Sequence, residues 1–189
     1  TTDMTNDGNP VFDPEGRYLY FLSSRDYDLE FSSIEFDYMV TDSVRVYAAQ
    51  LNADQPALFL PESDEVGDEA NKDENGSDDE ESNEALRIDF DGITDRVVAL
   101  QDGGGAYREL KASPKGPVYI AGAGDDSAVH WFDLDDKEEK VVLTGVQDFS
   151  LSGNGDKLLF RANGALGIAE LKAEQDSAEG RLALDDMEL

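Results

Sequence analysis

Short apolar runs recur along this chain and are separated by clusters of turn-forming residues. From Val44 to Ala48, small apolar side chains alternate with Arg45 and Tyr47, the two-residue period of a strand with one buried face. The runs are rich in Val, Leu, Tyr and Phe, which favours strands over helices. Seven such strands are predicted, at residues 18–22, 44–51, 97–100, 118–121, 129–134, 141–143 and 157–160.

Turn chemistry bounds these runs and leaves little room for helices. Gly, Pro, Asn and Asp gather between the predicted strands, for example at residues 102–105 and 114–116. Residues 166–175 fit a helix, weakened by Gly164 and Gly167, but residues 168–171 also fit a strand. Short strands with closely spaced turns predict an all-β domain.

One hairpin unit occurs three times, at residues 10–21, 110–120 and 149–160. Each copy has a short strand, a Ser/Asp-x-x-Gly turn and a second apolar strand, with the glycine supplying the positive φ of a tight turn. Gly116 and Gly155 lie 39 residues apart, close to the ~40–45 residues of a four-stranded propeller blade. The repeat therefore predicts a partial β-propeller of about three four-stranded blades.

The repeat also sets the expected domain limits. Residues 1–9 are expected to form an N-terminal tail, and residues 10–189 the propeller segment. The blades are placed at about 10–100, 105–145 and 146–189, with residues 181–184 as an outer strand of the last. The first blade is longer than four strands need, and its extra length is assigned to the connection 26–42 and an insertion at 62–85. Three blades do not close a ring of the usual ~4–8, so either the chain is a piece of a longer polypeptide or several copies close a ring together.

Charge changes this picture most at the insertion. Residues 62–85 hold twelve carboxylates, one Lys and no aromatic residue, so they bury too little apolar surface to offset their ordering entropy and are expected to be a disordered acidic loop. The whole chain carries 44 Asp+Glu against 15 Lys+Arg, a net charge of −29. This charge repels phosphate and anionic lipid, so neither nucleic-acid nor membrane partners are expected. Cysteine is absent, which excludes disulfides and a Cys nucleophile.

The sequence of the hairpins and the segments around them resembles a known family. The segments that carry the likeness are VFDPEGRYLYFLSSR at 11–25, VRVYAAQL at 44–51, IDFDGITDRVVAL at 88–100 and DFSLS at 148–152. In this order they resemble the second propeller of tricorn proteases, a TolB-like propeller, over about residues 10–189 apart from the insertion. The sequence departs from the family in the length of that insertion and in Gly153-Asn154-Gly155, which replaces the commoner x-Asp-Gly turn.

The resemblance implies a large serine peptidase as the parent protein. Tricorn-like peptidases have two propellers, a PDZ-like domain and two catalytic domains, form hexamers, and trim peptides at a Ser/His-based site. Their second propeller has seven blades and admits or screens substrate, so this chain would be its last three blades. None of the family's catalytic residues maps onto residues 1–189. The chain is therefore expected to be a non-catalytic scaffold and gate without cofactor or metal, and its acidic surface is expected to favour basic or neutral peptides.

Partners and compartment follow from the same resemblance. The expected partners are the remaining blades and catalytic domains of the parent chain, peptide substrates, and further copies of the parent in a homo-oligomer. The protein is expected in the cytoplasm, or alternatively in the periplasm. The competing hypothesis is a protein-binding propeller of the TolB or WD-repeat kind with no peptidase attached. A propeller hydrolase such as a metal-using lactonase is a weaker third reading, because the chain has a single histidine.

The single histidine is the first candidate for a catalytic base. His130 precedes Trp131 in a predicted strand and follows Asp125, Asp126 and Ser127. A Ser-His-Asp device needs the base within hydrogen-bond reach of the hydroxyl, and no G-x-S-x-G nucleophile turn exists in the sequence. His130 is therefore interpreted as a strand histidine beside a packed Trp.

The other candidate motifs favour structural roles. The run 103–105 of three glycines lacks a Gly-Lys-Ser/Thr ending and is interpreted as a blade connection, not a phosphate loop. The acidic run 73–79 does not match EF-hand spacing and is expected to bind cations only diffusely. The glycosylation sequon at 75–77 is interpreted as chance. Four aspartates are expected to hydrogen-bond the turns between strands, as in Asx-turns, and not to line a channel: Asp13, Asp89, Asp91 and Asp95.

Aromatic residues gather in the long first-blade connection. A contact surface for substrate or partner is one interpretation, because loops on rigid scaffolds carry binding residues. Packing against a neighbouring domain or blade is the favoured one, because one exposed patch of these side chains is costly. The residues concerned are Tyr27, Phe31, Phe36 and Tyr38.

Overall fold

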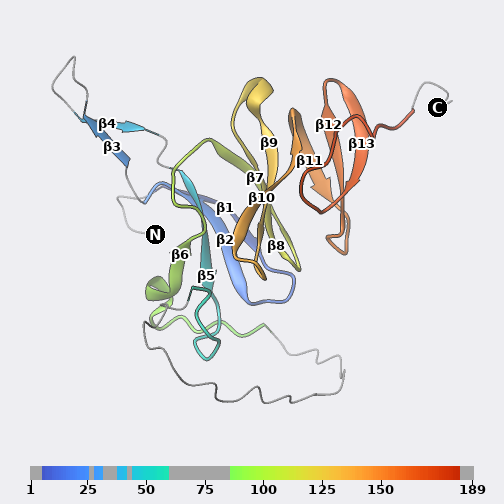
Figure 1. The fold of residues 1–189 in the computed structure, drawn as a ribbon. Helices are drawn as coiled ribbons and strands as arrows, with labels where there is room; N and C mark the ends of the chain where they lie inside the picture. The colour runs from blue at the N-terminus through green and yellow to red at the C-terminus, as the bar shows by residue number, and fades with distance from the viewer. Residues whose placement is uncertain (1–5, 26–27, 32–37, 42–43, 60–85, 184–189) are drawn as a thin grey trace, which may run out of the picture.

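The computed structural model describes residues 6–25, 28–31, 38–41, 44–59 and 86–183. Within these ranges the chain forms three antiparallel sheets of three or four strands that stand side by side, together with a two-stranded sheet and two short 3-10 helices (Figure 1). These helices are η1 (Ile93–Arg96) and η2 (Gly124–Asp126). No helix in the described residues is long and apolar enough to cross a membrane. The prediction of an all-β chain is confirmed.

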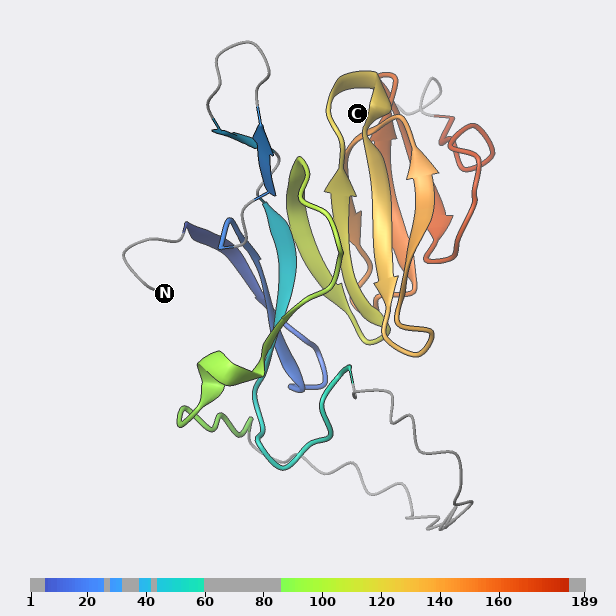
Figure 2. The ribbon, with the colours of Figure 1, turned by 60° about the vertical axis from the view of Figure 1, so that its left-hand side comes forward.

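The first sheet has the strand order β1-β2-β5-β6, and an extra hairpin is inserted between β2 and β5. That hairpin is a separate two-stranded sheet of β3 (Asp28–Phe31) and β4 (Tyr38–Thr41), and it projects away from the three sheets (Figure 2). Phe31 and Tyr38 are register partners in it. The sheet itself consists of β1 (Asp7–Phe12), β2 (Tyr18–Ser23), β5 (Arg45–Gln50) and β6 (Val97–Ala99).

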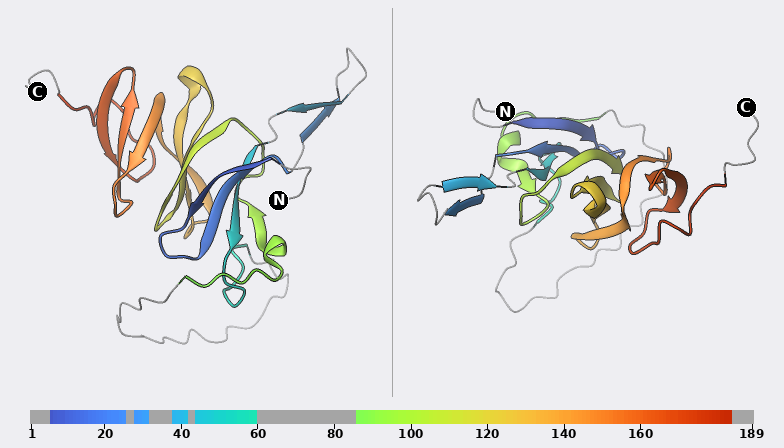
Figure 3. Two further views of the ribbon diagram at one scale, coloured as in Figure 1. Left: turned by 180° about the vertical axis from the view of Figure 1, so that it is seen from behind. Right: turned by 90° about the horizontal axis from the view of Figure 1, so that it is seen from above.

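The second and third sheets follow in chain order. The second has the order β7-β8-β9-β10, and the third has the order β11-β12-β13. The first strands of the three sheets are neighbours, because β7 contacts both β1 and β11, and the sheets fan out from there in the view from above (Figure 3). This is the blade arrangement of a partial propeller. The strands are β7 (Tyr107–Ser113), β8 (Gly116–Ala121), β9 (Ala128–Asp133), β10 (Glu138–Thr144), β11 (Val146–Leu151), β12 (Lys157–Ala162) and β13 (Ala165–Glu170).

Two boundaries differ from the sequence expectation. The first strand begins at Asp7, inside the expected tail, because Asn9 adopts a left-handed φ of 50° at a bulge and the pairing with β2 continues past it. The expected outer strand of the last blade is reduced to one bridge between Gly167 and Arg181. Backbone hydrogen bonds flank this bridge on both sides, so the third sheet has three strands and a remnant of a fourth. The ambiguous stretch 166–175 begins as a strand, β13.

Two apolar cores join the three sheets. Alternate residues of β8 point to opposite faces, so the second sheet packs against the first on one side and the third on the other. The core between the first and second sheets includes Tyr18, Tyr20, Leu22, Val46, Ala48, Leu58, Leu100, Leu110, Tyr119, Phe132 and Leu134. The core between the second and third sheets includes Val118, Ile120, Val129, Trp131, Val142, Leu143, Val146, Phe149, Leu158, Phe160, Ala162 and Leu171.

The repeated turns also link each blade to the next. The guanidinium of Arg17, after the first turn, donates to the carbonyl of Pro114 in the second turn at 2.7 Å. Lys115 of the second turn lies 3.7 Å from a carboxylate oxygen of Asp156, after the third turn. A cation from one turn thus reaches an oxygen of the next at both blade junctions.

Close packing of the turns explains one glycine of the repeat. Gly155 has a φ of 76°, and a Cβ there would lie 2.7 Å from Cδ of Pro114 and 2.9 Å from Cβ of Ser113. Gly164 has nearly the same φ, 77°, but nothing lies within 4 Å of its Cβ position. These two glycines therefore separate backbone strain from steric clash.

We expect Gly155→Ala to destabilise the chain more than Gly164→Ala. The left-handed backbone costs each alanine about 1–2 kcal/mol, and Gly155→Ala adds the forced movement of the neighbouring turn, about 1 kcal/mol or more. Urea unfolding of the two variants measures the difference. Equal losses would show that the turns of the second and third blades do not press on each other.

Candidate functional site

The first sheet carries an apolar face that no other sheet of the described residues covers. This face, called the backward face here, holds the residues of β2, β5 and β6 that point away from the second sheet. Phe21 is the register partner of Tyr47, and Leu19 is the partner of Ala49. The cluster consists of Leu19, Phe21, Tyr47, Ala49, Val97 and Ala99.

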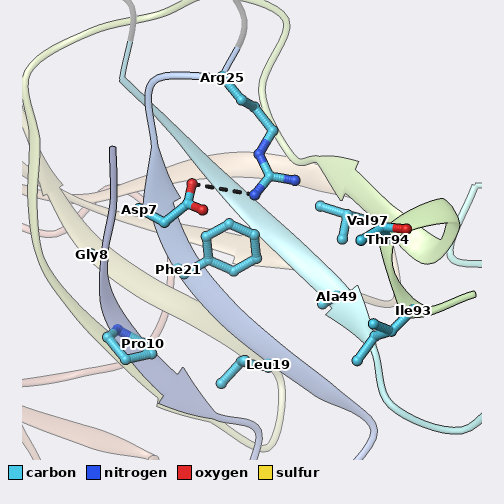
Figure 4. Close-up of a pocket in the computed structure, with 10 residues that line it drawn as sticks. All are labelled: Asp7, Gly8, Pro10, Leu19, Phe21, Arg25, Ala49, Ile93, Thr94 and Val97. Atoms are coloured by element: carbon cyan, nitrogen blue, oxygen red, sulfur yellow. Dashed lines mark hydrogen bonds and ion pairs between the residues drawn. The ribbon is translucent and has the colours of Figure 1, made fainter. Parts of the chain in front are cut away.

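A pocket of about 480 Å³ opens on the backward face (Figure 4). Its walls come from β1, β2, β5, η1 and β6, so residues far apart in the sequence build it. Most of the labelled side chains that surround it are apolar, and the charged pair Asp7 and Arg25 stands at one end. The lining residues are Asp7, Gly8, Pro10, Leu19, Phe21, Arg25, Ala49, Ile93, Thr94 and Val97.

Arg25 covers the aromatic pair of this face. Its guanidinium lies 4.8 Å from the ring centre of Phe21 and 4.9 Å from that of Tyr47, within cation–π range. The two rings stack with centroids 5.7 Å apart. Arg25 also lies 3.2 Å from Asp7 and donates to the hydroxyl of Ser23 at 3.2 Å.

The charge balance at this end is local. Burial alone would raise the pKa of Asp7, but hydrogen bonds from Ser23 and Arg25 outweigh it and lower that pKa below its ordinary value. The carboxylate therefore stays ionised at neutral pH. The pocket thus offers an apolar surface with one compensated ion pair, a set of groups suited to packing and not to bond-making chemistry.

The one histidine belongs to a partly buried polar network between the first two sheets. Gln101 accepts from the backbone N–H of Val46 on β5 at 3.0 Å and donates to the hydroxyl of Tyr119 at 2.6 Å. That hydroxyl donates to the carboxylate of Glu139 at 2.6 Å. Nδ1 of His130 lies 3.1 Å from the same carboxylate, within ion-pair distance but not aligned for a hydrogen bond. The network ties β5 of one blade to β8, β9 and β10 of the next.

The structure does not bring His130 and Ser127 together as a catalytic pair. Ser127 is 1% exposed, and its hydroxyl lies 2.8 and 2.6 Å from the backbone carbonyl oxygens of Gly124 and Val146, which share its one proton. His130 instead faces Glu139 and stacks on Tyr119, with ring centres 6.1 Å apart. Asp125 and Asp126 lie in η2. The side chains of Ser127 and His130 therefore each have structural partners, and His130 is a residue of strand β9.

We expect Glu139→Gln to destabilise the chain at neutral pH and less so in acid. Burial raises the pKa of Glu139, but its contacts with His130 and Tyr119 prevail and leave that pKa below the ordinary value. Such a carboxylate stabilises the fold above its unfolded pKa, and this contribution is lost as the pH falls through the folded pKa. Because a third of the side chain is exposed, we expect a loss of about 1 kcal/mol near pH 7.

Urea unfolding at pH 7 and pH 3 measures this difference. Glu138→Gln is the matched control, because it removes the same charge from a neighbouring exposed position of β10. A pH-independent loss for Glu139→Gln, or an equal loss in the control, would contradict the role of the carboxylate.

The remaining sequence candidates divide into those that the structure places and those outside it. Asp13 is buried beside Arg17, and Asp89 accepts from the backbone N–H of Ala53 at 2.9 Å, so both tie turns as expected. Residues 102–104 line a groove beside β10. The acidic segment 62–85, with its sequon, and Tyr27 and Phe36 lie outside the described residues.

Sequence reasoning missed the features that long-range contacts create. The β3–β4 hairpin was expected to be a connection, although the pattern of 28–31 and 38–41 is strand-like on inspection. The roles of Arg25 and Glu139 carried no local signal, because Asp7 and Tyr47, which Arg25 joins, lie on other strands, and the partners of Glu139 lie across strand pairs. The backward face did have a signal, since Leu19 and Phe21 alternate with Tyr18 and Tyr20 in a strand that is apolar on both sides.

Comparisons with known proteins point to one family. The model of the tricorn protease second beta propeller domain matches residues 1–172. The chain is 23% identical over 185 residues to a putative tricorn-like protease C-terminal subunit of Sulfurisphaera tokodaii, covering 93% of this chain and 20% of that protein. It is 25% identical over 186 residues to a tricorn protease homolog of Saccharolobus solfataricus, covering 93% of this chain and 16% of that protein.

The fold agrees with this assignment. A crystal structure of the tricorn protease superposes with a TM-score of 0.63 at 18% identity, covering 90% of this chain and 16% of that one. At this identity the likeness shows the fold alone. The chain spans a fifth or less of the length of these relatives. Because the family model matches most of its length, the chain belongs to the tricorn protease second beta-propeller domain family.

Proposed function

We propose that this chain is a non-catalytic propeller segment of a tricorn-like serine peptidase, which supports the catalytic domains and screens peptides on their way to a site elsewhere in the parent. The observation that carries the proposal is the backward face. An apolar sheet face with a 480 Å³ pocket suits packing against a further blade, as the first two sheets pack against their successors. The side chains that sequence analysis considered for catalysis have structural partners.

Screening would act through charge. With 44 acidic and 15 basic residues, the segment attracts basic peptides and repels acidic ones over a distance set by the ionic strength. A peptidase with this segment at its entrance should cleave a Lys-flanked peptide faster than the matched Glu-flanked peptide at low salt, and the ratio should fall towards one at high salt.

The test uses the full-length parent protein. Rates on the two peptides are compared at about 0.02 M and about 0.5 M salt, in the wild type and in a variant with Gln and Asn in place of the acids at 62–85. Equal rates at low salt would remove the screening role. A parent reading frame without a catalytic half would remove the peptidase assignment and favour the protein-binding propeller.

A further inference from the structure

Two turns of the third sheet contain the dipeptide Asn-Gly, which is chemically labile. Asn154-Gly155 lies in the repeated turn between β11 and β12, and Asn163-Gly164 joins β12 to β13. In such a dipeptide the backbone nitrogen of the glycine can attack the side-chain amide carbon of the asparagine, because glycine has no side chain to obstruct the approach. The third Asn-Gly of the sequence, at residues 75–76, lies outside the described residues.

The turn at Asn154 holds the reacting groups in other contacts. The side-chain oxygen of Asn154 accepts from the hydroxyl of Ser152 at 2.7 Å and from the backbone N–H of Asp156 at 3.3 Å. Its side-chain nitrogen donates to the carboxylate of Asp156 at 2.9 Å. The nitrogen that would attack is also engaged, because the N–H of Gly155 donates to the carbonyl of Ser152 at 2.9 Å. The amide and the glycine N–H therefore have to leave these partners before they can react.

The turn at Asn163 has no such restraint. Among the described residues, neither the side chain of Asn163 nor the N–H of Gly164 has a hydrogen-bond partner. The two residues end the β12–β13 hairpin beyond the register pair of Ala162 and Ala165, and both are exposed. Their φ angles of 51° and 77° are those of the two-residue turns that favour Asn-Gly. The backbone of this turn thus suits the dipeptide, while its side-chain amide is left unprotected.

We propose that Asn163 is a site of spontaneous deamidation, whereas the turn at Asn154 protects its own asparagine. A bond forms between the backbone nitrogen of Gly164 and Cγ of Asn163, and the bond from Cγ to the side-chain nitrogen breaks. The proton of the Gly164 N–H is passed through water to the departing nitrogen, which leaves as ammonia. Water then opens the cyclic imide at either carbonyl and yields aspartate or isoaspartate. The reaction consumes only water, and the inference does not depend on the peptidase assignment.

The products change the hairpin in two ways. Each adds a negative charge to a chain of net charge −29. Isoaspartate also lengthens the backbone by one carbon between β12 and β13, in a turn whose left-handed φ values fit two ordinary residues. Because the length of a turn sets the register of its hairpin, isoaspartate at position 163 should weaken the pairing of β12 with β13.

Site-resolved mass spectrometry of the aged protein tests the proposal. The full 189-residue chain is incubated in mildly alkaline buffer, digested, and assayed for conversion at each asparagine. In the folded chain Asn163 should convert about tenfold faster than Asn154, because hydrogen bonds at Asn154 must break first. In urea the two rates should become similar, since a glycine follows in both cases. Circular dichroism verifies that the chain is folded throughout the first incubation.

Three variants separate the protective contacts from the chemistry. Ser152→Ala removes a partner of Asn154 and should raise its rate severalfold without changing the rate at Asn163. Gly164→Ala places a methyl group beside the attacking nitrogen and should slow conversion at Asn163 alone. Asn163→Asp supplies the aspartate product directly, so an aged chain that contains isoaspartate should unfold at a lower urea concentration than this variant.

Three outcomes would overturn the proposal. Equal conversion at the two sites of the folded chain, or faster conversion at Asn154, would contradict the assignment of Asn163. Conversion at both sites in urea but at neither in the folded chain would show that the β12–β13 turn protects its asparagine as well. A Ser152→Ala variant in which Asn154 reacts no faster than in the wild type would reject the protective role of the hydrogen bonds.

Discussion

Arg17→Met is expected to lower the free energy of unfolding by about 3 kcal/mol, because it leaves a buried carboxylate without its cation. Arg17 holds Asp13 with two hydrogen bonds, of 2.7 and 3.1 Å. The side chain of Asp13 is 0% exposed and that of Arg17 is 30% exposed. The same guanidinium reaches Pro114 of the next blade, so the substitution loosens both a turn and a blade junction.

Urea unfolding at neutral pH measures this loss. The control is Arg161→Met, because Arg161 is 54% exposed and its partner Asp148 is also half-exposed, so this pair should contribute less than about 1 kcal/mol. Similar small losses in the two variants would mean that water reaches Asp13 and that the first turn is not anchored to the second.

Phe160→Ala is expected to cost about 3–5 kcal/mol, the usual range for removing a buried phenyl ring. Phe160 is 1% exposed in the core between the second and third sheets. Its ring lies against the backbone of Gly167, where a Cβ would come within 2.3 Å of it. Gly167 is fixed in β13 between its partner strand β12 and the bridge to Arg181. The cavity left by the ring therefore has little freedom to collapse.

The neighbouring residue provides the control for this substitution. Leu159 follows the same strand but faces outward, so Leu159→Ala should change the unfolding free energy by about 0.5 kcal/mol or less. Both variants are measured by thermal and urea unfolding at a concentration where the chain is monomeric. Equal losses would show that β12 is rotated relative to the two sheet faces assigned to it.

How much of this fold was predictable depends on whether a signal is local. The strands around Tyr18 and Val118 were predictable, because in each case a short run of apolar residues closely follows the glycine of a tight turn. The residues Asp7, Gly8 and Asn9 were assigned to an N-terminal tail, yet they belong to β1, because a bulge with a positive φ at Asn9 accommodates them. A short-range pattern does not report the partner strand that stabilises such a segment.

The candidate site was less predictable than the fold. Its pocket is built from five elements between Asp7 and Val97, and the guanidinium of Arg25 reaches it only because β1 and β5 flank β2. A single sequence does not show which distant residues lie close together in the fold. His130 was interpreted as a structural residue because the sequence has no G-x-S-x-G nucleophile turn. Its partner in the structure, Glu139, is brought close by the pairing of β9 with β10.

The central position of the second sheet determines how mutational effects combine. It supplies Tyr119 and Phe132 to one core and Val118 and Trp131 to the other. Losses at the first junction and at the second should therefore be additive, because changes in separate contacts seldom interact. The effect of a core substitution in β8 or β9 on the free energy of unfolding should instead be non-additive with a substitution at either junction. The chain thus behaves as a short linear array with nearest-neighbour coupling, in which the middle unit controls cooperative unfolding.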